Sequence, residues 1–339
     1  MSIRAVFFFC CICFAAGRDQ KPIAVRVVVV TMFERGADTG DEPGEFQYWV
    51  EREKLDRSLS FPQGNRDLRM NATGVLGVVT GVGTAKAAST IMALGLDPRF
   101  DLTKAYWVIA GIAGVNPGAA SLGSAAWAEW VVDGDLGHEI DAREIPPDWK
   151  TGFVPLRKSV PYELPKAPDE GQVYRLNPRL VDWAYNLTKN VKLDDNESIR
   201  AEREKFTSPN ARRPPFVLKG DTLSSSTFWH GKLLNQWATD WVNYYTEGQG
   251  SYVTSAMEDT GTLQSLTFLA KAGKVDLQRV VVLRTASNFD QPAPGRSPAE
   301  SLGATRIGRY AAFLPALEAA WRVGHVVVEE IAGHWEKYR

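Results

Sequence analysis

Two short segments of the chain contain residue types that suit the recognition of a small polar ligand. In residues 255–260 (SAMEDT), Met257 precedes Glu258, and residues 280–288 (VVVLRTASN) form an apolar run that ends in Asn288. A carboxylate can accept hydrogen bonds from two neighbouring hydroxyls of a sugar while a thioether covers the apolar face of the ring. An amide at the carboxyl end of a strand lies where open α/β proteins bind their ligands. Together the segments predict a nucleoside pocket, with the ribose held by the first and the base by the second.

Alternating strands and helices are expected to position these segments. Short β-branched runs are typical of buried strands, and alanine-rich or amphipathic runs between them are typical of helices packed on a sheet. The sequence predicts strands over residues 23–32, 75–80, 105–110, 125–132, 252–254 and 280–283, and helices over residues 85–96, 178–189, 227–245, 260–273 and after Ser301. This alternation indicates an α/β sandwich.

The middle of the chain differs from the rest. Residues 145–215 are rich in proline and charged residues and contain one expected helix. They are predicted to form an insertion or a lid over the α/β core. The following helix, over residues 227–245, repeats aromatic residues at three- and four-residue spacing, which is typical of a core-facing stripe. Only Phe228, Trp229 and His230, at its start, are expected to reach the pocket.

The amino terminus has the pattern of a secretory signal peptide. Arg4 precedes the apolar run 5–16 (AVFFFCCICFAA), and small residues follow where a signal peptidase reads the chain. The run is shorter than the roughly twenty residues that a membrane-spanning helix needs. We therefore expect residues 1–17 to be removed and residues 18–339 to form one exported domain, with no membrane insertion of the mature chain.

Composition narrows the compartment and the partners. All three cysteines lie in the expected signal segment, so the mature chain would contain no disulfide, thiol nucleophile or thiolate metal site. An exported chain without cysteine fits a bacterial periplasm. A net charge of −1 does not favour a nucleic acid as partner. Four scattered histidines without thiols predict no metal site.

Eight short motifs occur along the mature chain in a fixed order. They are Met32-Phe33, residues 81–87 (GVGTAKA), 111–114 (GIAG), 138–141 (HEID), Gly220-Asp221, 229–231 (WHG), 256–260 (AMEDT) and 283–288 (LRTASN). This order resembles the purine nucleoside permease (NUP) family, which is similar in fold to the nucleoside phosphorylase and nucleosidase superfamily. The resemblance implies a three-layer α/β/α sandwich with a central mixed sheet. The family name implies nucleoside uptake, and the fold implies cleavage of the N-glycosidic bond.

The resemblance assigns Met257 and Glu258 to the ribose and Asn288 to the purine base. A fixed carboxylate near the sugar would also stabilise positive charge at the anomeric carbon during cleavage. Asn can hydrogen-bond a leaving base but cannot protonate it, which points to 6-oxopurines or a weaker acid role. The alternatives are a helix-terminal charge for Glu258 and a turn position for Asn288. Asp290 is a second candidate for the acid.

A phosphate site is disfavoured by the glycine-rich motifs. The candidate anion or sugar loop contains four glycines, Gly81, Gly83, Gly111 and Gly114, which could equally form tight turns. In the phosphorylases that this chain resembles, an Arg and a hydroxyl residue beside the second loop hold phosphate. Here those positions are Ile109 and Ile112, which leaves Arg35 or Arg284 as substitutes. Phosphate as a co-substrate is therefore disfavoured, and no cofactor is expected.

If water is the acceptor, a general base must lie near the anomeric carbon. Glu34, close behind Met32, and Glu45 are the two candidates, and a solvated loop carboxylate is the alternative for Glu34. The resemblance places His138 at a subunit interface or at the pocket edge. It also gives Asp221 a base-binding or supporting role.

These observations predict an exported purine-nucleoside-recognising protein that cleaves the N-glycosidic bond, by hydrolysis in preference to phosphorolysis. The alternative is a non-catalytic binding component of nucleoside transport. The partner is a purine nucleoside, and a homo-oligomer and a membrane transport partner both remain open.

Overall fold

The computed structural model describes residues 21–304 and 310–339. The expected signal segment, residues 1–17, and its three cysteines lie outside the described residues.

The centre of the molecule is a mixed sheet to which the described residues contribute twelve strands. The main path is β12 (Val173–Arg175), β9 (Trp130–Asp133), β14 (Asp221–Ser224), β15 (Tyr252–Ala256), β7 (Tyr106–Val115), β2 (Val27–Thr31), β5 (Val75–Val79), β4 (Leu68–Met70) and β3 (Arg57–Leu59). A branch from β7 adds β16 (Val280–Phe289), β8 (Ala125–Ala128) and β13 (Val217–Lys219). β2, β5, β7 and β16 run parallel, whereas β15 pairs with β7 in the antiparallel sense. Two separate pairs are β1 (Ile23–Ala24) with β6 (Phe100–Asp101) and β10 (Gly137–Glu139) with β11 (Phe153–Pro155).

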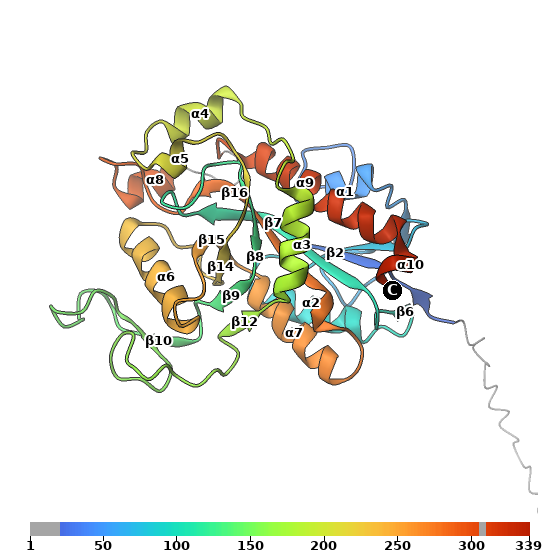
Figure 1. Ribbon diagram of the computed structural model, residues 1–339, viewed down its shortest axis with the longest axis horizontal. Helices are drawn as coiled ribbons and strands as arrows, with labels where there is room; N and C mark the ends of the chain where they lie inside the picture. Colours follow the sequence, from blue (N-terminus) through green and yellow to red (C-terminus); the bar gives the residue numbers. More distant parts are fainter. Residues whose placement is uncertain (1–20, 305–309) are drawn as a thin grey trace, which may run out of the picture.

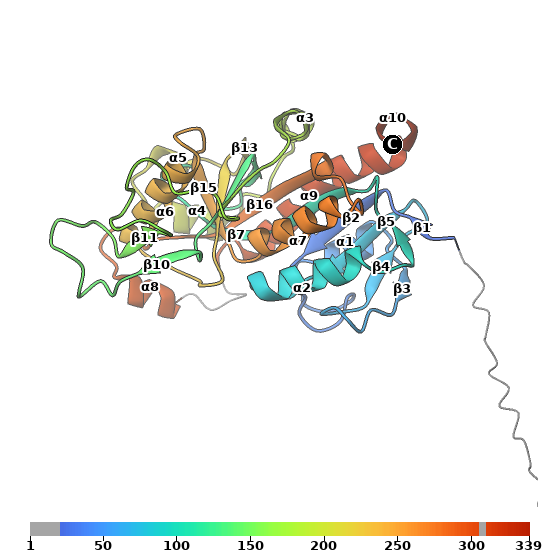
Figure 2. The ribbon, with the colours of Figure 1, turned by 90° about the horizontal axis from the view of Figure 1, so that it is seen from below.

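Helices cover both faces of this sheet. On one face α9 (Phe313–Gly333) lies with α3 (Pro178–Thr188) and α1 (Gln47–Arg52), and on the other α2 (Thr84–Gly95) packs against α7 (Asp259–Lys271) (Figures 1 and 2). α6 (Lys232–Tyr245) packs on β14 and β15. Shorter helices are α4 (Glu197–Arg203), α5 (Pro209–Arg212), α8 (Pro298–Ala304), α10 (Trp335–Tyr338) and the 3-10 helix Leu277–Arg279. The layers confirm the predicted α/β/α sandwich with a central mixed sheet.

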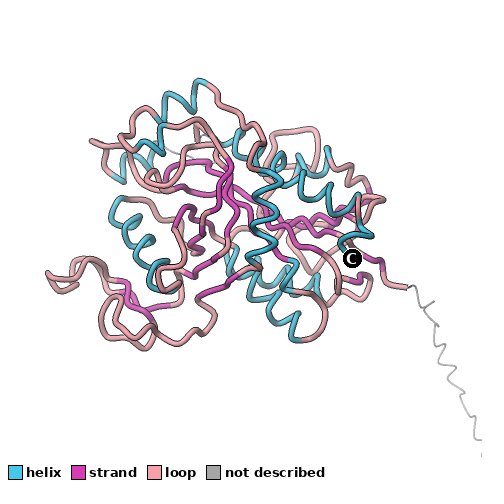
Figure 3. The backbone as a smooth tube through the Cα atoms, in the orientation of Figure 1, coloured by secondary structure: helices cyan, strands magenta, loops and turns pink. Residues whose placement is uncertain are grey.

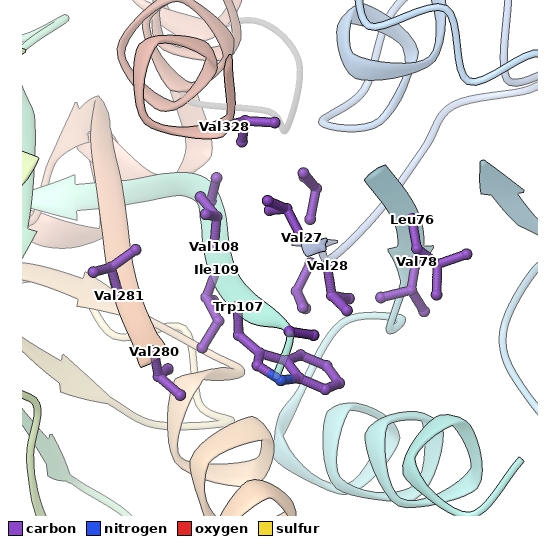
Figure 4. Packing of buried hydrophobic residues seen from close by; sticks show 14 of the residues in the cluster. Val27, Val28, Leu76, Val78, Trp107, Val108, Ile109, Val280, Val281 and Val328 are labelled. Carbon is purple, nitrogen blue, oxygen red and sulfur yellow. The ribbon is translucent and has the colours of Figure 1, made fainter. Parts of the chain in front are cut away.

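The core lies between these layers. β2 and β5 are buried along their whole length, because parallel strands covered on both faces bury both sets of side chains. Figure 4 shows neighbouring strands packed side by side, with Val328 of α9 on one side and Trp107 of β7 on the other. Figure 3 shows the strands gathered in the centre with the helices around them. This rigid centre holds the strand ends that carry the candidate site.

Several predicted strands have wrong boundaries, and the one over residues 23–32 is divided into β1 and β2. The predicted strand over residues 125–132 is divided at Glu129 into β8 and β9, which pair with different neighbours. The predicted strands over 105–110 and 280–283 end too early, because β7 and β16 pair with each other as far as Val115 and Phe289. The GIAG motif therefore lies inside a strand, and it is not a loop.

The helix predicted over residues 227–245 begins five residues later. Gly231 has a φ of 152°, a left-handed conformation that an α-helix cannot pass through. Helix α6 therefore starts at Lys232. Phe228, Trp229 and His230 lie in the segment before it, so they are not on the helix.

The helices of the central insertion form two groups with different positions. Helix α3 joins the main core through Val181 and Ala184, and Thr188 accepts a hydrogen bond from the Trp127 indole at 2.9 Å. This part belongs to the sandwich and is not a lid. The second part, with α4 and α5, packs through Ile199 and other apolar residues on a separate cluster that includes the end of β16. This second part forms one wall of the cavity beside Asn288.

Candidate functional site

A buried arginine organises the candidate site. Arg284, on β16, has no solvent exposure. Its Nε lies 3.1 and 3.0 Å from the two carboxylate oxygens of Asp259, and its Nη2 lies 2.5 Å from Asp259 and 3.3 Å from Glu258. Its Nη1 donates to the Ile112 carbonyl at 3.2 Å and faces the Met32 sulfur at 3.6 Å. The guanidinium is therefore fully occupied by protein groups. Burial lowers its pKa, but the charges of Asp259 and Glu258 outweigh burial and raise it.

Glu45 is a second buried acid beside this arginine. One carboxylate oxygen accepts from the Met32 backbone N–H and the other from the Ile112 N–H, both at 2.7 Å. Burial raises the pKa of Glu45 to about 8, although Arg284 and the two N–H donors lower it. The negative charge of Glu258 raises the Glu45 pKa further. Glu45 therefore has a pKa close to neutral pH, where a proton-transfer group works best.

Glu258 closes the cluster at the start of α7. Its carboxylate accepts from the backbone N–H of Gly83, from its neighbour Met257, and from Arg284, each at 3.3 Å. Burial raises the Glu258 pKa, and Arg284 opposes that shift. Gly83 lies in the turn between β5 and α2 with a φ of 97°, so this turn supplies a backbone donor to the site. Met257 is half-buried beside it.

The two central glycines allow close packing of the site. A Cβ at Gly111 would lie 2.6 Å from Arg284 Nη1 and 2.7 Å from both the Glu45 carboxylate and the Met32 sulfur. A Cβ at Gly114 would lie 2.6 Å from the Ser255 hydroxyl and 3.5 Å from the Asn288 amide nitrogen. The prediction of an anion loop at Gly111 and Gly114 is therefore wrong, because side chains of the site fill the space above this strand.

The structure brings the two predicted segments to one place in the sheet. Gly114 pairs with Ser255 of β15 on one side and with Asn288 of β16 on the other. The Ser287 hydroxyl lies 2.9 Å from the Asn288 amide oxygen, and the Asn288 amide nitrogen donates to the Phe289 carbonyl at 3.1 Å. A carbonyl can only accept, so it fixes the nitrogen on that side of the amide.

A cavity of about 290 Å³ opens beside Asn288. Phe228 and His230 line it, and Ser198, Glu202 and Phe206 of the central insertion form part of its wall. His230 Nε2 lies 3.0 Å from the Ser301 hydroxyl, and burial lowers the His230 pKa. The cavity is therefore lined by aromatic and polar side chains, among them the charged Glu202 and Arg296, and part of the central insertion forms one wall.

Four other predicted site residues lie elsewhere. Trp229 packs edge-on against Trp237 in an aromatic cluster and does not line this cavity. Asp221 accepts from the backbone N–H groups of Glu129, Trp130 and Ser251 at the opposite end of β14. It ties strands together, so its position does not support base binding.

Glu34 and His138 are also separate from the cluster. The Glu34 carboxylate accepts from four backbone N–H groups, those of Arg35, Gly44, Phe46 and Gln47. It therefore holds its own loop and the start of α1 in place. His138 is exposed on the β10–β11 hairpin, which projects from the body of the molecule (Figure 1). This exposed position is compatible with an interface, and His138 does not line the cavity beside Asn288.

Asp259 and Asp290 are acids whose surroundings the sequence did not reveal. Asp259 is the main partner of Arg284, although its only sequence signal is its place at a helix start. Asp290 is buried, with the Tyr252 hydroxyl 2.5 Å away and the Asn235 amide 3.0 Å from both oxygens. Burial raises the Asp290 pKa to about 7. It joins the ends of β16, β15 and α6 behind Asn288.

The described residues contain neither a metal-ligand cluster nor a candidate membrane span. Within residues 21–304 and 310–339, no group of three or more His, Cys, Asp or Glu side chains is arranged to hold a metal ion. In the same part of the chain, no helix has the length and apolar character needed to cross a membrane.

Comparison with known proteins gives one family. A family model described as purine nucleoside permease (NUP) matches residues 24–339. A protein named probable purine nucleoside permease from Schizosaccharomyces pombe is 35% identical over 266 residues, which cover 76% of this chain and 76% of the relative. A purine nucleoside permease of Candida albicans is 33% identical over 264 residues, which cover 77% of this chain and 64% of that relative.

Solved structures share the fold at low identity. The 5'-methylthioadenosine/S-adenosylhomocysteine nucleosidase of Neisseria meningitidis has a TM-score of 0.51 and 13% identity, covering 92% of this chain and 100% of the nucleosidase. The futalosine hydrolase of Helicobacter pylori has a TM-score of 0.53 and 12% identity, covering 90% and 98%. These similarities confirm the predicted nucleoside phosphorylase-like fold, and at such identities they show the fold alone.

Proposed function

The chain belongs to the purine nucleoside permease (NUP) family, and we propose that it recognises a purine nucleoside and cleaves the N-glycosidic bond with water. The observation that carries this proposal is the buried set of acids around Arg284. Glu45, Glu258 and Asp259 surround one guanidinium, so acidic groups outnumber the single base. Departure of a purine leaves positive charge on the ribose, and fixed negative groups stabilise that charge.

The ribose is assigned to Met257 and Glu258. The Gly83 N–H and Arg284 hold the Glu258 carboxylate in one orientation. A carboxylate oxygen can accept more than one hydrogen bond, so Glu258 can keep these partners and accept from a ribose hydroxyl. The purine is assigned to the cavity beside Asn288, whose amide nitrogen has a second hydrogen to donate to N7.

Glu45 is the group we assign to water activation. Its pKa of about 8 gives a minor but useful fraction of base at neutral pH. Glu45 also lies beside the same arginine as Glu258, which places it close to the proposed ribose site. Glu34 is less suited to this role, because four backbone N–H groups occupy its carboxylate.

The contacts of Arg284 and Arg35, the two arginines that could replace the usual phosphate ligands, favour water over phosphate as the acceptor. Arg284 directs its donors to Asp259, Glu258, Ile112 and Met32. Arg35 pairs with Glu42 on the surface at 2.6 Å. An attacking phosphate needs several charge-assisted donors, and neither arginine is free to provide them.

The test is release of free purine base. The chain from residue 18 is incubated with inosine, adenosine and guanosine, with and without phosphate, and the free base is measured by chromatography. We expect release that does not depend on phosphate, and its loss in Glu258→Ala. Glu336→Ala, which changes an exposed acid near the carboxyl terminus, is the matched control and should behave as wild type. Release only in phosphate would overturn the hydrolytic assignment.

The second candidate is a non-catalytic binding component of nucleoside transport. The names of the matched family and of the relatives favour it, since all are called permeases. Such a protein needs the cavity and the ribose carboxylate but no water-activating acid. Saturable binding of a nucleoside with no free base would support this function and overturn the enzymatic one.

We also propose that residues 1–17 direct export to a bacterial periplasm, on the basis of their apolar run and the absence of cysteine after it. Mass spectrometry of the chain recovered from the periplasmic fraction would then find an amino terminus near residue 18. An intact amino terminus in the cytoplasmic fraction would overturn this part of the proposal.

A further inference from the structure

Gln291, which lines the cavity beside Asn288, carries a side-chain oxygen without a partner. The side-chain oxygen Oε1 of Gln291 is buried, and no hydrogen-bond donor lies within reach of it. Gln291 lines the same cavity as Asn288. The other buried side-chain atoms without a partner in the described part of the chain belong to residues that do not line this cavity.

An unpartnered buried acceptor is costly to the folded protein. Leaving one unsatisfied costs about 1–3 kcal/mol, and most buried polar groups in proteins have a partner. A ligand that donates a hydrogen bond to Gln291 would recover this free energy on binding. Because Gln291 lines a cavity, rotation of its amide toward a bound ligand would give this oxygen the partner that it lacks in the free protein.

Asn288 and Gln291 offer complementary groups to a base. The Phe289 carbonyl holds the amide nitrogen of Asn288, which keeps one hydrogen for the cavity. Asn288 therefore presents a donor, whereas Gln291 presents an acceptor. A purine carries a matching pair, because N7 accepts a hydrogen bond and the six-membered ring carries an N–H. That N–H is N1–H in hypoxanthine and guanine and the 6-amino group in adenine.

We infer that Gln291 is a specificity-determining residue that accepts a hydrogen bond from an N–H on the six-membered ring of the purine. It restricts the ligands to purine nucleosides that carry such a donor. The inference rests on the proposed function for the presence of a purine nucleoside in this cavity. It adds a residue that none of the sequence motifs includes.

The test compares inosine with purine riboside, which has the same ribose and N7 but no N–H on the ring. Dissociation constants are measured by calorimetry with the mature chain carrying Glu45→Gln, so that the nucleoside is not consumed. We expect purine riboside to bind about tenfold more weakly than inosine, as loss of one such contact implies. In Gln291→Met the two ligands should bind about equally.

The matched control is Gln291→Glu, which keeps an acceptor oxygen and should keep the preference for inosine. Equal binding of the two ligands by the parent protein, or an unchanged preference in Gln291→Met, would overturn the assignment of Gln291 and leave the proposed function intact. Failure to bind any purine nucleoside would instead overturn the proposed function, and the assignment with it.

Discussion

At the scale of single residues, the site depends on how four buried ionisable groups are balanced. Arg284 and Asp259 are both fully buried and joined through two guanidinium nitrogens. Neither charged group is exposed to water, so each charge is stabilised mainly by the other. Glu45 and Glu258 then lie at the edge of this pair, where burial raises the pKa of both. The pair therefore sets the electrostatic surroundings of the two groups assigned to chemistry.

Replacing Asp259 by Asn should strongly destabilise the fold. The change leaves a buried guanidinium without its main partner, and breaking a buried ion pair in this way costs about 3–5 kcal/mol. Urea denaturation followed by tryptophan fluorescence measures the free energy of unfolding. Glu42→Gln, which removes a pair with Arg35 at the surface, is the control and should change little. A loss in Asp259→Asn as small as that in the control would contradict the assigned role of the pair.

The raised pKa of Glu45 also predicts how stability depends on pH. The folded protein binds this proton up to a pKa of about 8, whereas the unfolded chain releases it near 4.5. The contribution of Glu45 is therefore fully present below pH 4.5 and is lost as pH rises through 8. The slope reaches at most about 1.4 kcal/mol per pH unit. Asp290, with a pKa raised to about 7, adds to it in the same direction.

Glu45→Gln should flatten this decline in unfolding free energy between about pH 5 and pH 8. The variant loses one of the two backbone hydrogen bonds at Glu45, so the readout is the slope with pH and not the absolute stability. Asp290→Asn is the comparison variant, and it should flatten the decline over a narrower range that ends near its pKa of about 7. An unchanged slope in Glu45→Gln would show that Glu45 is ionised in the folded protein at neutral pH.

At the scale of elements, β7 is the strand that assembles the site. Its early part pairs with β2 and β16, and its last residues pair with β15 and β16. This change of partner brings Asn288 and the Ser255–Glu258 segment to the two sides of one strand. The sequence predicted that the two segments lie close together, and their pairing with β7 agrees with this. It could not predict the continuous strand between them, because a glycine-rich motif is typical of a turn and pairing with distant strands has no local signal.

Gly111→Ala tests this arrangement. The new methyl group would lie within 2.6–2.7 Å of Arg284, Glu45 and Met32, and such overpacking costs about 1–3 kcal/mol. We expect a lower midpoint of urea unfolding and loss of nucleoside binding. Gly333→Ala is the control, since nothing lies within 4 Å of its added Cβ. If Gly111→Ala has the unfolding midpoint and the nucleoside affinity of the control, the close packing described around β7 is contradicted.

At the scale of the whole molecule, the fold was more predictable than the details of the site. Alternating buried strands and helices were sufficient for the α/β/α layers, because periodicity reports burial directly. The insertion was harder to interpret, since α3 packs into the core while the segment with α4 lines the cavity. Glu258 and Asn288 could be proposed as site residues from their motifs. Asp259 and Gln291 were given no role, and Arg284 only that of a substitute phosphate ligand, because their contacts join distant parts of the chain.

The central claim is that the chain cleaves purine nucleosides with Glu45 as the base that activates water. The most direct test is kcat/KM for inosine, measured without phosphate from pH 5.5 to pH 9 for wild type and Glu45→Gln. A base is active when deprotonated, so kcat/KM should rise about tenfold per pH unit and level off above a pKa of about 8. Glu45→Gln should remove this rise and most of the activity. A wild-type rate that is independent of pH in this range, or a Glu45→Gln variant that keeps the wild-type profile, would contradict the claim.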